Sequence, residues 1–475
     1  MTSRVTTAKT ALDLQEAGLT LTEVAKYPRP GTAIPGDLAF SPDDRLVTYL
    51  LSPDVSLTRH LYAFDPETGN QVPLVVPADG GTSEEALSLE EALQRERQRR
   101  LEVGVTQYAW AKHAQRLVIP MQGNIYVQDG LGAPLRLVVE GGGQPALDAQ
   151  LSPNGEHVAY VQESEVYVVP AAGGEPRQVT EGARGMGRTN GLADYIAQEE
   201  MARHHGFWWS PDSQWIAFTE VDETHIPLYR IVHQGKDATG ESAQEDHRFP
   251  FAGEANAKVR LGVVASDGGE PVWMELEEGD EYLARVEWFP NGTLSAQVEN
   301  RAQTELTLVR FDPRTGKRRT LLQETTDVWI NLHDLFRPLE NGAGGFVWAS
   351  ERTGFRHLYL YDEQGNLVRP LTGGEWMVDN VAGVDEAGEQ VYFTATRDGP
   401  TECHLYAVSL AGGEPRRITS EPGLHTVVTD QACGRFIDVH HALGKSPGVT
   451  LRSLDDGSLL RTIFEQADPR VEGLG

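Results

Sequence analysis

The hydrophobic positions of the chain follow a short pattern that returns along almost its whole length. Each copy is an apolar run with alternating exposure, as in residues 61–69, and it is followed by a turn that contains Asp or Gly. Alternation with a period of two predicts a half-buried strand. Further copies of this run begin at Ile125, Val166, Leu261, Leu306, Leu358, Leu405 and Val449.

A second element stands before several of these runs. An apolar residue is followed by Ser-Pro-Asp, Ser-Pro-Asn or Pro-Asn-Gly, which predicts a core residue and then a tight turn into the next strand. The element occurs at residues 40–44, 151–155, 209–213 and 289–292. Together the two elements predict four short antiparallel strands per copy. We therefore expect an all-β fold, an eight-bladed β-propeller of four-stranded antiparallel blades with two helical insertions.

The two insertions are read from the spacing of the copies. Five of the seven intervals run from about 41 to 52 residues, which suits one blade each. The intervals from Leu61 to Ile125 and from Val166 to Leu261 are longer. Insertions in repeat proteins map to loops on one face, which is often the binding face. We expect the chemistry of the protein to lie in these two segments.

The first insertion predicts a short helix. Residues 88–91 form a capping box, in which Ser88 and Glu91 bond to free backbone N–H groups at the helix start. Good helix formers follow, and the helix is expected to end near Gly104, with Arg97, Arg99 and Arg100 in its last turn. One interpretation is a solvated helix whose arginines complement its negative carboxyl end. The other is that one arginine holds a peptide carbonyl.

The second insertion, residues 182–206, predicts a short helix over 193–202 that carries Glu199 and Glu200. Neighbours on a regular helix point about 100° apart, so both carboxylates meet one ligand only at an irregular helix end. One interpretation is two solvated glutamates. The other is a receptor for a cation, and a peptide α-amino group, with three donors and a pKa near 8, fits it.

The aromatic residues after this helix have a simpler interpretation. Trp208, Trp209 and Trp215 are expected in the core.

Composition narrows the classes of partner. The formal net charge is −29, which disfavours nucleic acid and anionic membrane surfaces and favours a cationic ligand.

The two cysteines, Cys403 and Cys433, form no disulfide framework, and we see no signal peptide or membrane span, so a cytoplasmic location is expected. The pairs His204-His205 and His440-His441 have no spacing that assembles a metal site, and we predict no cofactor and no metal.

Several separated segments of the chain match one known family in the correct order. They are residues 198–201 with 206–211, residues 221–224 with Pro227, residues 87–91, 95–99 and 104–108, and residues 348–352 with 357–362. Through these segments the chain resembles the dipeptidyl peptidase IV subfamily of the prolyl oligopeptidase-like serine peptidases, in a bacterial type, and the resemblance runs over roughly residues 20–470.

The resemblance implies a propeller at residues 29–470 that caps an α/β-hydrolase domain. Residues 1–28 would pack on that domain, and 471–475 would begin the linker to it. The family releases dipeptides from peptides with a free N-terminus, and the N-terminus-binding roles would fall on Glu199 and Glu200. An arginine holds a substrate carbonyl; by its distance from Gly104, Arg99 matches best and Arg97 is second. An arm at residues 226–252 would contribute to a homodimer.

The one literal nucleophile elbow, residues 444–448, is rejected. The residue after the nucleophile must donate its backbone N–H to the oxyanion, and Pro447 after Ser446 has none. We therefore expect no peptidase activity from this chain alone. Two alternatives stay open: a noncatalytic propeller scaffold for protein partners, which has no need of Arg99, Glu199 and Glu200, and a prolyl oligopeptidase or acylaminoacyl peptidase propeller, for which two such glutamates would be unhelpful.

Overall fold

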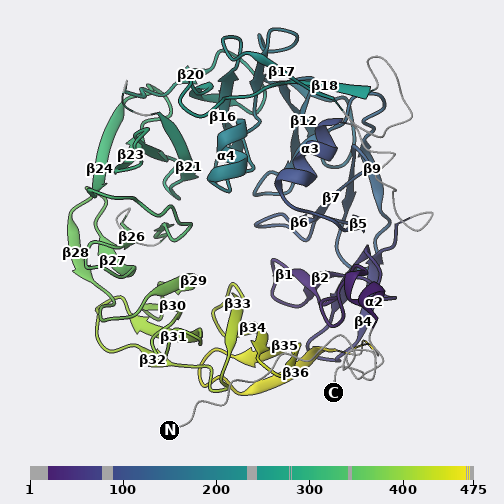
Figure 1. The fold of residues 1–475 in the computed structure, drawn as a ribbon, viewed down its shortest axis with the longest axis vertical. Coiled ribbons are helices and arrows are strands. Elements are labelled where there is room, and N and C mark those ends of the chain that lie inside the picture. The colour runs from purple at the N-terminus through teal and green to yellow at the C-terminus, as the bar shows by residue number, and fades with distance from the viewer. Residues whose placement is uncertain are drawn as a thin grey trace. The chain divides into compact units, whose positions relative to one another are not determined.

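The computed structural model describes residues 20–77, 89–232, 243–277, 279, 281–340, 345–466, 468 and 470. Eight successive antiparallel sheets, each with four strands in sequence order along its main path, form the blades of a β-propeller (Figure 1). This confirms the predicted fold class. The eight apolar runs found in the sequence are the third strands of the eight blades, and the residue that begins each run is at most 2 % exposed.

Two compact units can be distinguished, and each is described by itself. The first unit comprises residues 1–83, 101–107 and 374–475. It holds α2 (Leu21–Ala25), the short strand β5 (Val103–Gly104), which pairs with β3, and three blades. These blades are β1 (Gly36–Phe40), β2 (Val47–Leu51), β3 (Thr58–Phe64) and β4 (Gln71–Val75); β29 (Val378–Asp385), β30 (Gln390–Ala395), β31 (His404–Ser409) and β32 (Arg416–Arg417); β33 (Leu424–Thr429), β34 (Arg435–Ala442), β35 (Lys445–Ser453) and β36 (Leu459–Glu465).

The second unit comprises residues 84–100 and 108–373. It holds α3 (Leu89–Arg97), α4 (Tyr195–Glu200), the hairpin β17 (Leu228–Val232) and β18 (Gln244–Arg248), and five blades. These blades are β6 (Ala109–Trp110), β7 (Leu117–Met121), β8 (Asn124–Gln128) and β9 (Arg136–Val139); β10 (Leu147–Leu151), β11 (His157–Gln162), β12 (Glu165–Pro170) and β13 (Arg177–Gln178); β14 (Arg188–Asn190), β15 (Phe207–Trp209), β16 (Trp215–Asp222), β19 (Lys258–Ala265) and β20 (Val272–Trp273); β21 (Tyr282–Trp288), β22 (Leu294–Glu299), β23 (Glu305–Phe311) and β24 (Arg318–Thr325); β25 (Arg337–Pro338), β26 (Phe346–Ser350), β27 (His357–Tyr361) and β28 (Leu367–Pro370).

The Ser-Pro turns have a common hydrogen-bond arrangement. In the first blade, Ser41 Oγ donates to Asp43 Oδ1 at 2.7 Å and accepts the backbone N–H of Leu46 at 3.0 Å. The same pair of bonds recurs around Ser152 and around Ser210. These three serines are at most 1 % exposed. A serine can be buried at this position because its hydroxyl bonds both the turn and the strand that follows.

In three blades, a threonine hydroxyl after the fourth strand bonds to the backbone of the third strand. Thr180, Thr372 and Thr419 each accept the backbone N–H of a third-strand residue at 2.8–3.0 Å. Two of them end the sequence tails 172–180 and 411–419, which are almost identical. The repeated letters therefore mark one repeated bond between the third strand and the end of the fourth.

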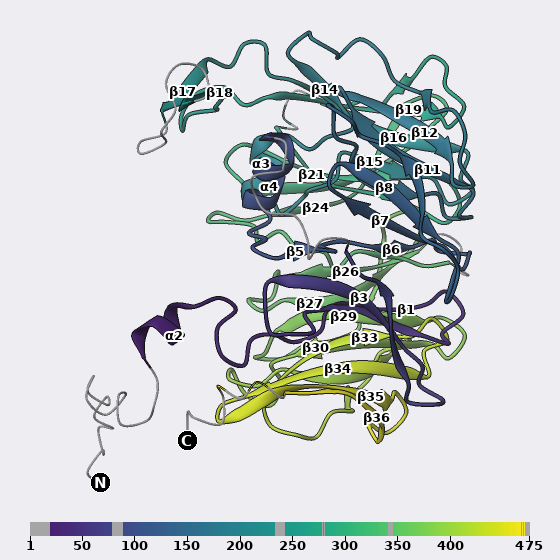
Figure 2. The same cartoon turned by 90° about the vertical axis from the view of Figure 1, so that its right-hand side faces the viewer.

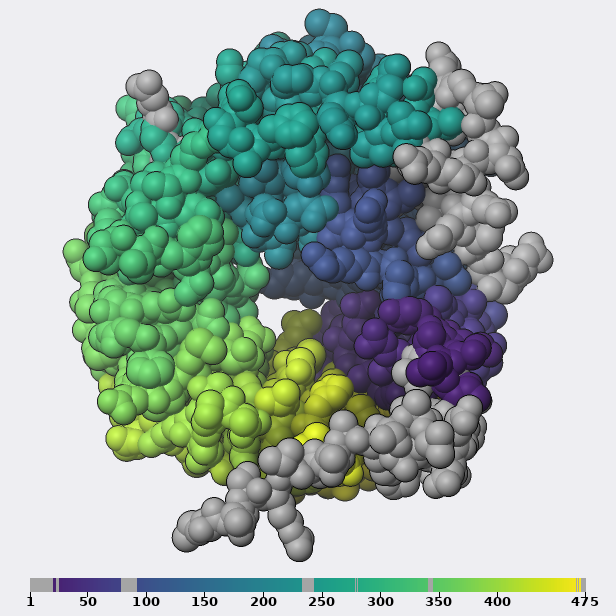
Figure 3. All heavy atoms as spheres, viewed as in Figure 1, coloured from purple at the N-terminus to yellow at the C-terminus, as the bar shows by residue number. Residues whose placement is uncertain are grey.

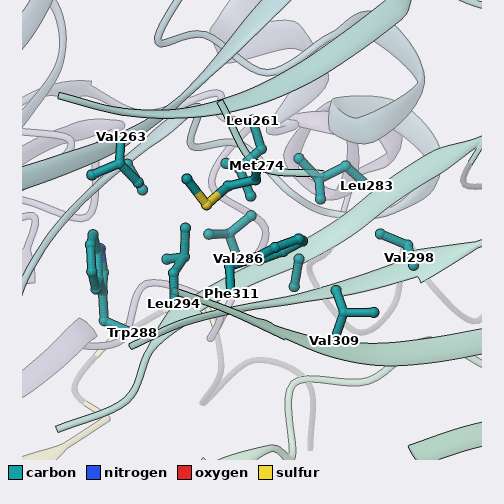
Figure 4. Packing of buried hydrophobic residues seen from close by; sticks show 12 residues of the cluster. Leu261, Val263, Met274, Leu283, Val286, Trp288, Leu294, Val298, Val309 and Phe311 are labelled. Carbon is teal, nitrogen blue, oxygen red and sulfur yellow. The ribbon is translucent and has the colours of Figure 1, made fainter. Parts of the chain in front are cut away.

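The hydrophobic core lies between neighbouring blades. Figure 4 shows one such layer, in which side chains of β19 face those of β21, β22 and β23. Phe311 and Leu294 are fully buried there, and Trp288 is 7 % exposed. In the first unit a corresponding cluster joins the blade β1–β4 to the blade β33–β36, which are far apart in sequence. In both units, apolar side chains thus fill the space between neighbouring blades.

Candidate functional site

The second insertion interrupts the first strand of its blade. β14 and β15 both pair with β16, β14 near Asp222 and β15 near Ile216, so the two short strands together occupy one edge. Residues 191–206 leave the sheet between them, and we call this segment the glutamate loop. The observed helix α4 is shorter than the predicted 193–202 and covers only Tyr195–Glu200.

The two ends of the glutamate loop meet backbone to backbone. A Cβ atom on Gly206 would lie 2.3 Å from the carbonyl carbon of Leu192, so only glycine fits there. Thr219 of β16 is fully buried, and its hydroxyl lies 3.0 Å from Leu192 O and 3.2 Å from Gly206 O. Both ends of the glutamate loop are therefore held against β16, and α4 lies between these two fixed ends.

Helix α4 places both glutamates at its carboxyl end. Asp194 caps the amino end, where its Oδ1 accepts the backbone N–H of Ala197 at 3.1 Å. Glu199 and Glu200 are the last two residues and both are exposed. Carboxylates next to the negative end of a helix are unfavourable for the helix itself. Their position is thus not explained by helix stability, and it suits a cation that binds there.

The tryptophans after the loop differ from expectation in one case. Trp209 is 8 % exposed and Trp208 is half-buried, but Trp215 is 37 % exposed. The prediction of a core position for Trp215 was wrong, because this residue begins β16 at the surface.

A histidine anchors the loop to the preceding blade. Nδ1 of His205 lies 2.6 Å from Oδ1 of Asp148 on β10, and the Asp148 side chain is only 5 % exposed. The negative charge of Asp148 raises the pKa of His205. Burial, followed by the charges of His205 and Arg100, lowers the pKa of the neighbouring His204. Two adjacent imidazoles therefore have opposite shifts.

We expect the two imidazoles to titrate in a fixed order, His205 at a higher pH than His204. The stabilisation from the His205–Asp148 pair should be complete below the ordinary imidazole pKa, near 6.5, and should be lost as the pH rises through the raised pKa of His205. NMR titration of the two ring Cε1–H signals measures this order. Asp148→Asn should lower the pKa of His205, and equal or reversed values in the wild type would contradict the prediction.

The helix of the first insertion lies beside α4 (Figures 1 and 2). The guanidinium carbon of Arg97, the last residue of α3, lies 5.2 Å from the ring centre of Tyr195, the first residue of α4. In Figure 3, which has the same view as Figure 1, atoms of α3 and α4 lie next to each other at the surface. The two insertions, separated by about a hundred residues in sequence, therefore meet.

A cavity of about 460 Å³ opens between α3, α4 and the arm, by which we mean residues 226–252. Glu199, Arg97 and Tyr195 line it from the helices, and Arg248 and Phe249 line it from the arm. Burial, and then the charge of Glu199, raises the pKa of Tyr195, so its phenol stays neutral and can donate a hydrogen bond. The cavity thus contains carboxylate, guanidinium and phenol groups.

Besides Glu199, four other acidic residues line the cavity, and Glu223 is one of them. Glu223 follows β16, and burial, together with the charge of Asp194, raises its pKa. Within the described part of the chain its side chain has no hydrogen bond or ion pair. Arg248 donates to Ile226 O at 2.5 Å and lies close enough to oppose the shift of Glu223.

The structure brings some of the predicted residues together and not others. Glu199 and Arg97 line the cavity, whereas Glu200 and Arg99 do not. α3 ends at Arg97, not near Gly104, so Arg99 lies beyond the helix, is exposed and has a φ of 53°. The predicted capping residue Ser88 lies outside the described residues, as does the Glu91 side chain.

Sequence reasoning missed Glu223, Arg248 and Phe249 as lining residues. Tyr195 could have been found, since it stands one helical turn before Glu199. Arg248 and Phe249 gave no signal, because the arm reaches the cavity only through tertiary folding.

The literal elbow sequence, residues 444–448, lies at the start of strand β35. Ser446 is exposed on β35, and the strand, not a helix, continues through residues 447–453. Within the described ranges, no group of three or more His, Cys, Asp or Glu side chains is arranged to hold a metal ion. No helix in the same ranges is long and apolar enough to cross a membrane.

Eight four-stranded blades, one of which carries a short helix with two glutamates on an insertion, define an eight-bladed β-propeller. The chain belongs to the family described as the dipeptidyl peptidase IV (DPP IV) N-terminal region, whose model matches residues 105–447. This confirms the family suspected from the sequence.

Individual relatives agree. The chain is 29 % identical over 441 residues to human dipeptidyl peptidase 8, covering 74 % of this chain and 49 % of that protein. It is 28 % identical over 277 residues to a probable dipeptidyl peptidase 4 of Aspergillus flavus, covering 55 % of this chain and 35 % of the relative. The chain thus spans half or less of these relatives' lengths.

A solved structure shows the same fold. The crystal structure of Porphyromonas gingivalis dipeptidyl peptidase 4 superposes with a TM-score of 0.78 at 20 % identity, over 96 % of this chain and 63 % of that one.

Proposed function

We propose that this chain is the substrate-gating propeller of a dipeptidyl peptidase IV-like serine exopeptidase and binds the free amino terminus of the peptide substrate. The carboxylates of Glu199 and Glu200 would accept hydrogen bonds from the ammonium group. An α/β-hydrolase domain would supply the nucleophile, because Ser446 lies on a strand before a proline. The proposal needs no metal or cofactor.

The observation that carries this proposal is that both carboxylates are exposed and lack partners among the described residues. Both are exposed at the unfavourable end of α4, and neither has a hydrogen bond or ion pair among the described residues. An ammonium has three donors and no acceptor, so two free carboxylates can satisfy and neutralise it. A solvated surface helix would gain nothing from two acids at this end.

The test compares a proline-containing tetrapeptide with its N-acetylated form, by calorimetric titration into the 475-residue chain at pH 7 and low salt. Exposed charge pairs contribute up to about 1 kcal/mol each, so we expect the free amino terminus to bind about fivefold to tenfold more tightly. Added salt should reduce this ratio. Equal affinities at low salt would refute the proposal.

One arginine of the first insertion would hold a backbone carbonyl of the same peptide. Arg99 matched this role best by sequence, but the location of Arg97 in the cavity wall next to Tyr195 supports Arg97. The number of residues between each arginine and Gly104 could not identify the right one, because tertiary packing sets the distance between α3 and α4.

Arg97→Ala and Arg99→Ala form a matched pair, since each removes one guanidinium from the same segment. A hydrogen bond from a charged donor contributes about 1.5–3 kcal/mol, so Arg97→Ala should weaken tetrapeptide binding about tenfold or more, and Arg99→Ala less than about twofold. The same titration measures both. The reverse order would assign the role to Arg99, and no effect from either would remove the arginine from the site.

The arm supports a homodimer as a further part of the proposal. β17 and β18 form a separate two-stranded sheet that projects from the strands of its blade (Figure 2). Leu228 and Val232 are more than 60 % exposed, and Tyr229 is 48 % exposed. A small sheet with exposed apolar side chains gains stability when another chain covers it.

A further inference from the structure

Arg203, near the end of the glutamate loop, is a buried charged residue. Its side chain is 4 % exposed, although the loop lies at the surface. Each guanidinium nitrogen has a partner: Nε donates to Leu283 O at 3.0 Å, Nη1 to His205 O at 2.8 Å, and Nη2 to Asp194 Oδ2 at 3.2 Å. The burial of a charge is costly unless it is paired in this way.

The partners of Arg203 include both ends of α4. Its side chain binds Asp194, the residue that caps the amino end. Its backbone N–H donates to Ala197 O at 2.9 Å, which satisfies a carbonyl that the short helix leaves open. The chain makes this return through Ala202, whose φ is 52°. One residue therefore fixes the helix from its start to its carboxyl end.

Another partner of Arg203 lies on the next blade. Leu283 belongs to β21, and the bond from Arg203 Nε ties the helix to that strand. The guanidinium also lies 5.9 Å from the ring centre of Trp208 on β15. Arg203 thus connects α4 and its loop to the neighbouring blade.

Helix α4 needs such a support. A helix of six residues is far below the length of about 12–15 residues at which isolated helices become marginally stable. The glutamates at its carboxyl end weaken it further. The position of the helix that carries the two glutamates is therefore set by tertiary bonds, not by the intrinsic stability of the helix.

We propose that Arg203 is a positioning residue for the amino-terminus site, which orients Glu199 and Glu200 without touching the peptide. This inference rests on the proposed function of the glutamates. It goes further because it attributes the orientation of the two glutamates to the buried guanidinium of Arg203. It therefore predicts that selectivity for a free amino terminus, and not only the stability of the protein, depends on Arg203.

The experiment measures the ratio of affinities for the free and the N-acetylated tetrapeptide in Arg203→Met, with Arg310→Met as the control. Arg310 is a half-buried arginine of β23 that donates to Glu363 O at 3.0 Å, and its guanidinium carbon lies 3.7 Å from the ring centre of Phe289. Both variants are studied well below their own unfolding temperatures. We expect the ratio to fall close to one in Arg203→Met and to keep its wild-type value in Arg310→Met.

Hydrogen exchange supplies a second readout. The amides of Ala197 and Gln198 donate to Asp194, so their protection should fall at least tenfold in Arg203→Met. If that variant does not fold, Asp194→Asn removes only the charge partner of Arg203 and should lower the affinity ratio partly.

The outcomes separate the two proposals. A wild-type ratio of one refutes the proposed function. A wild-type ratio above one that Arg203→Met retains, with only a lower unfolding temperature, overturns the positioning role and leaves the function of the glutamates standing.

Discussion

Glu199→Gln is expected to lower kcat/KM for dipeptide release by a factor of one hundred or more, in a polypeptide that carries a hydrolase domain after this chain. There the substrate ammonium would be covered, and the loss of one partner of a buried charge costs about 3–5 kcal/mol. In the 475-residue chain both glutamates are exposed, so the effect on binding should be much smaller. Glu200→Gln should act in the same direction.

The control for this prediction is Glu96→Gln. Glu96 is an exposed carboxylate that lines the same cavity from α3, and the proposal gives it no contact with the ammonium. Its replacement should change kcat/KM less than about threefold. An unchanged kcat/KM in Glu199→Gln and Glu200→Gln would refute the assignment of the amino-terminus site.

Glu299→Gln is expected to stabilise the protein at alkaline pH. Glu299 on β22 is 1 % exposed, and within the described residues its Oε1 has no hydrogen-bond partner. Burial raises its pKa to about 7, against the opposing effects of a bond from Gln303 and the charge of Arg285. The folded protein therefore holds this proton more tightly than the unfolded chain does.

The sign of the pH dependence follows from this proton. Stability should fall as the pH rises from the ordinary glutamate value, near 4.5, through 7, because the unfolded chain releases the proton first. A pKa difference of about 2.5 units corresponds to about 3 kcal/mol at pH 8, as an upper value. The isosteric amide carries no such penalty, so the variant should gain most of this stability above pH 7.

Urea unfolding at pH 5 and pH 8 measures the effect. The difference between variant and wild type should be small at pH 5 and large at pH 8. Glu305→Gln, on the adjacent strand β23 and exposed, is the control and should show no such pH dependence. A variant that is less stable than wild type at pH 8 would contradict the prediction.

Much of the fold could be read from the sequence because its periodic signals are local. The alternating runs at Leu61, Val166 and Leu405 identified third strands, since a strand buried between two blades needs apolar side chains at fixed spacing. The Ser-Pro turns were equally informative, because the serine and the residue two positions later bond to each other. Such bonds depend only on neighbours in sequence.

The candidate site could be read only in part. Glu199 stood out because an insertion places it where core packing has no need of it. The choice between Arg97 and Arg99 was beyond the sequence, because it depends on where α3 ends and how that helix packs on Tyr195. The prediction for Trp215 failed for a related reason. The strand that it begins was predicted correctly, but the exposure of its side chain depends on which face of the blade is open to solvent at that position.

The sequence by itself determined the repeat, the eight third strands and the two insertions, because these features follow from hydrophobic period and turn chemistry over a few residues. Only the tertiary structure decided how the two insertions pack together. It brought Arg97 beside α4, bonded Arg203 to Asp194 at the start of that helix and placed residues of the arm in the cavity wall. Contacts between segments a hundred residues apart depend on the packing of whole blades, and no local pattern encodes them.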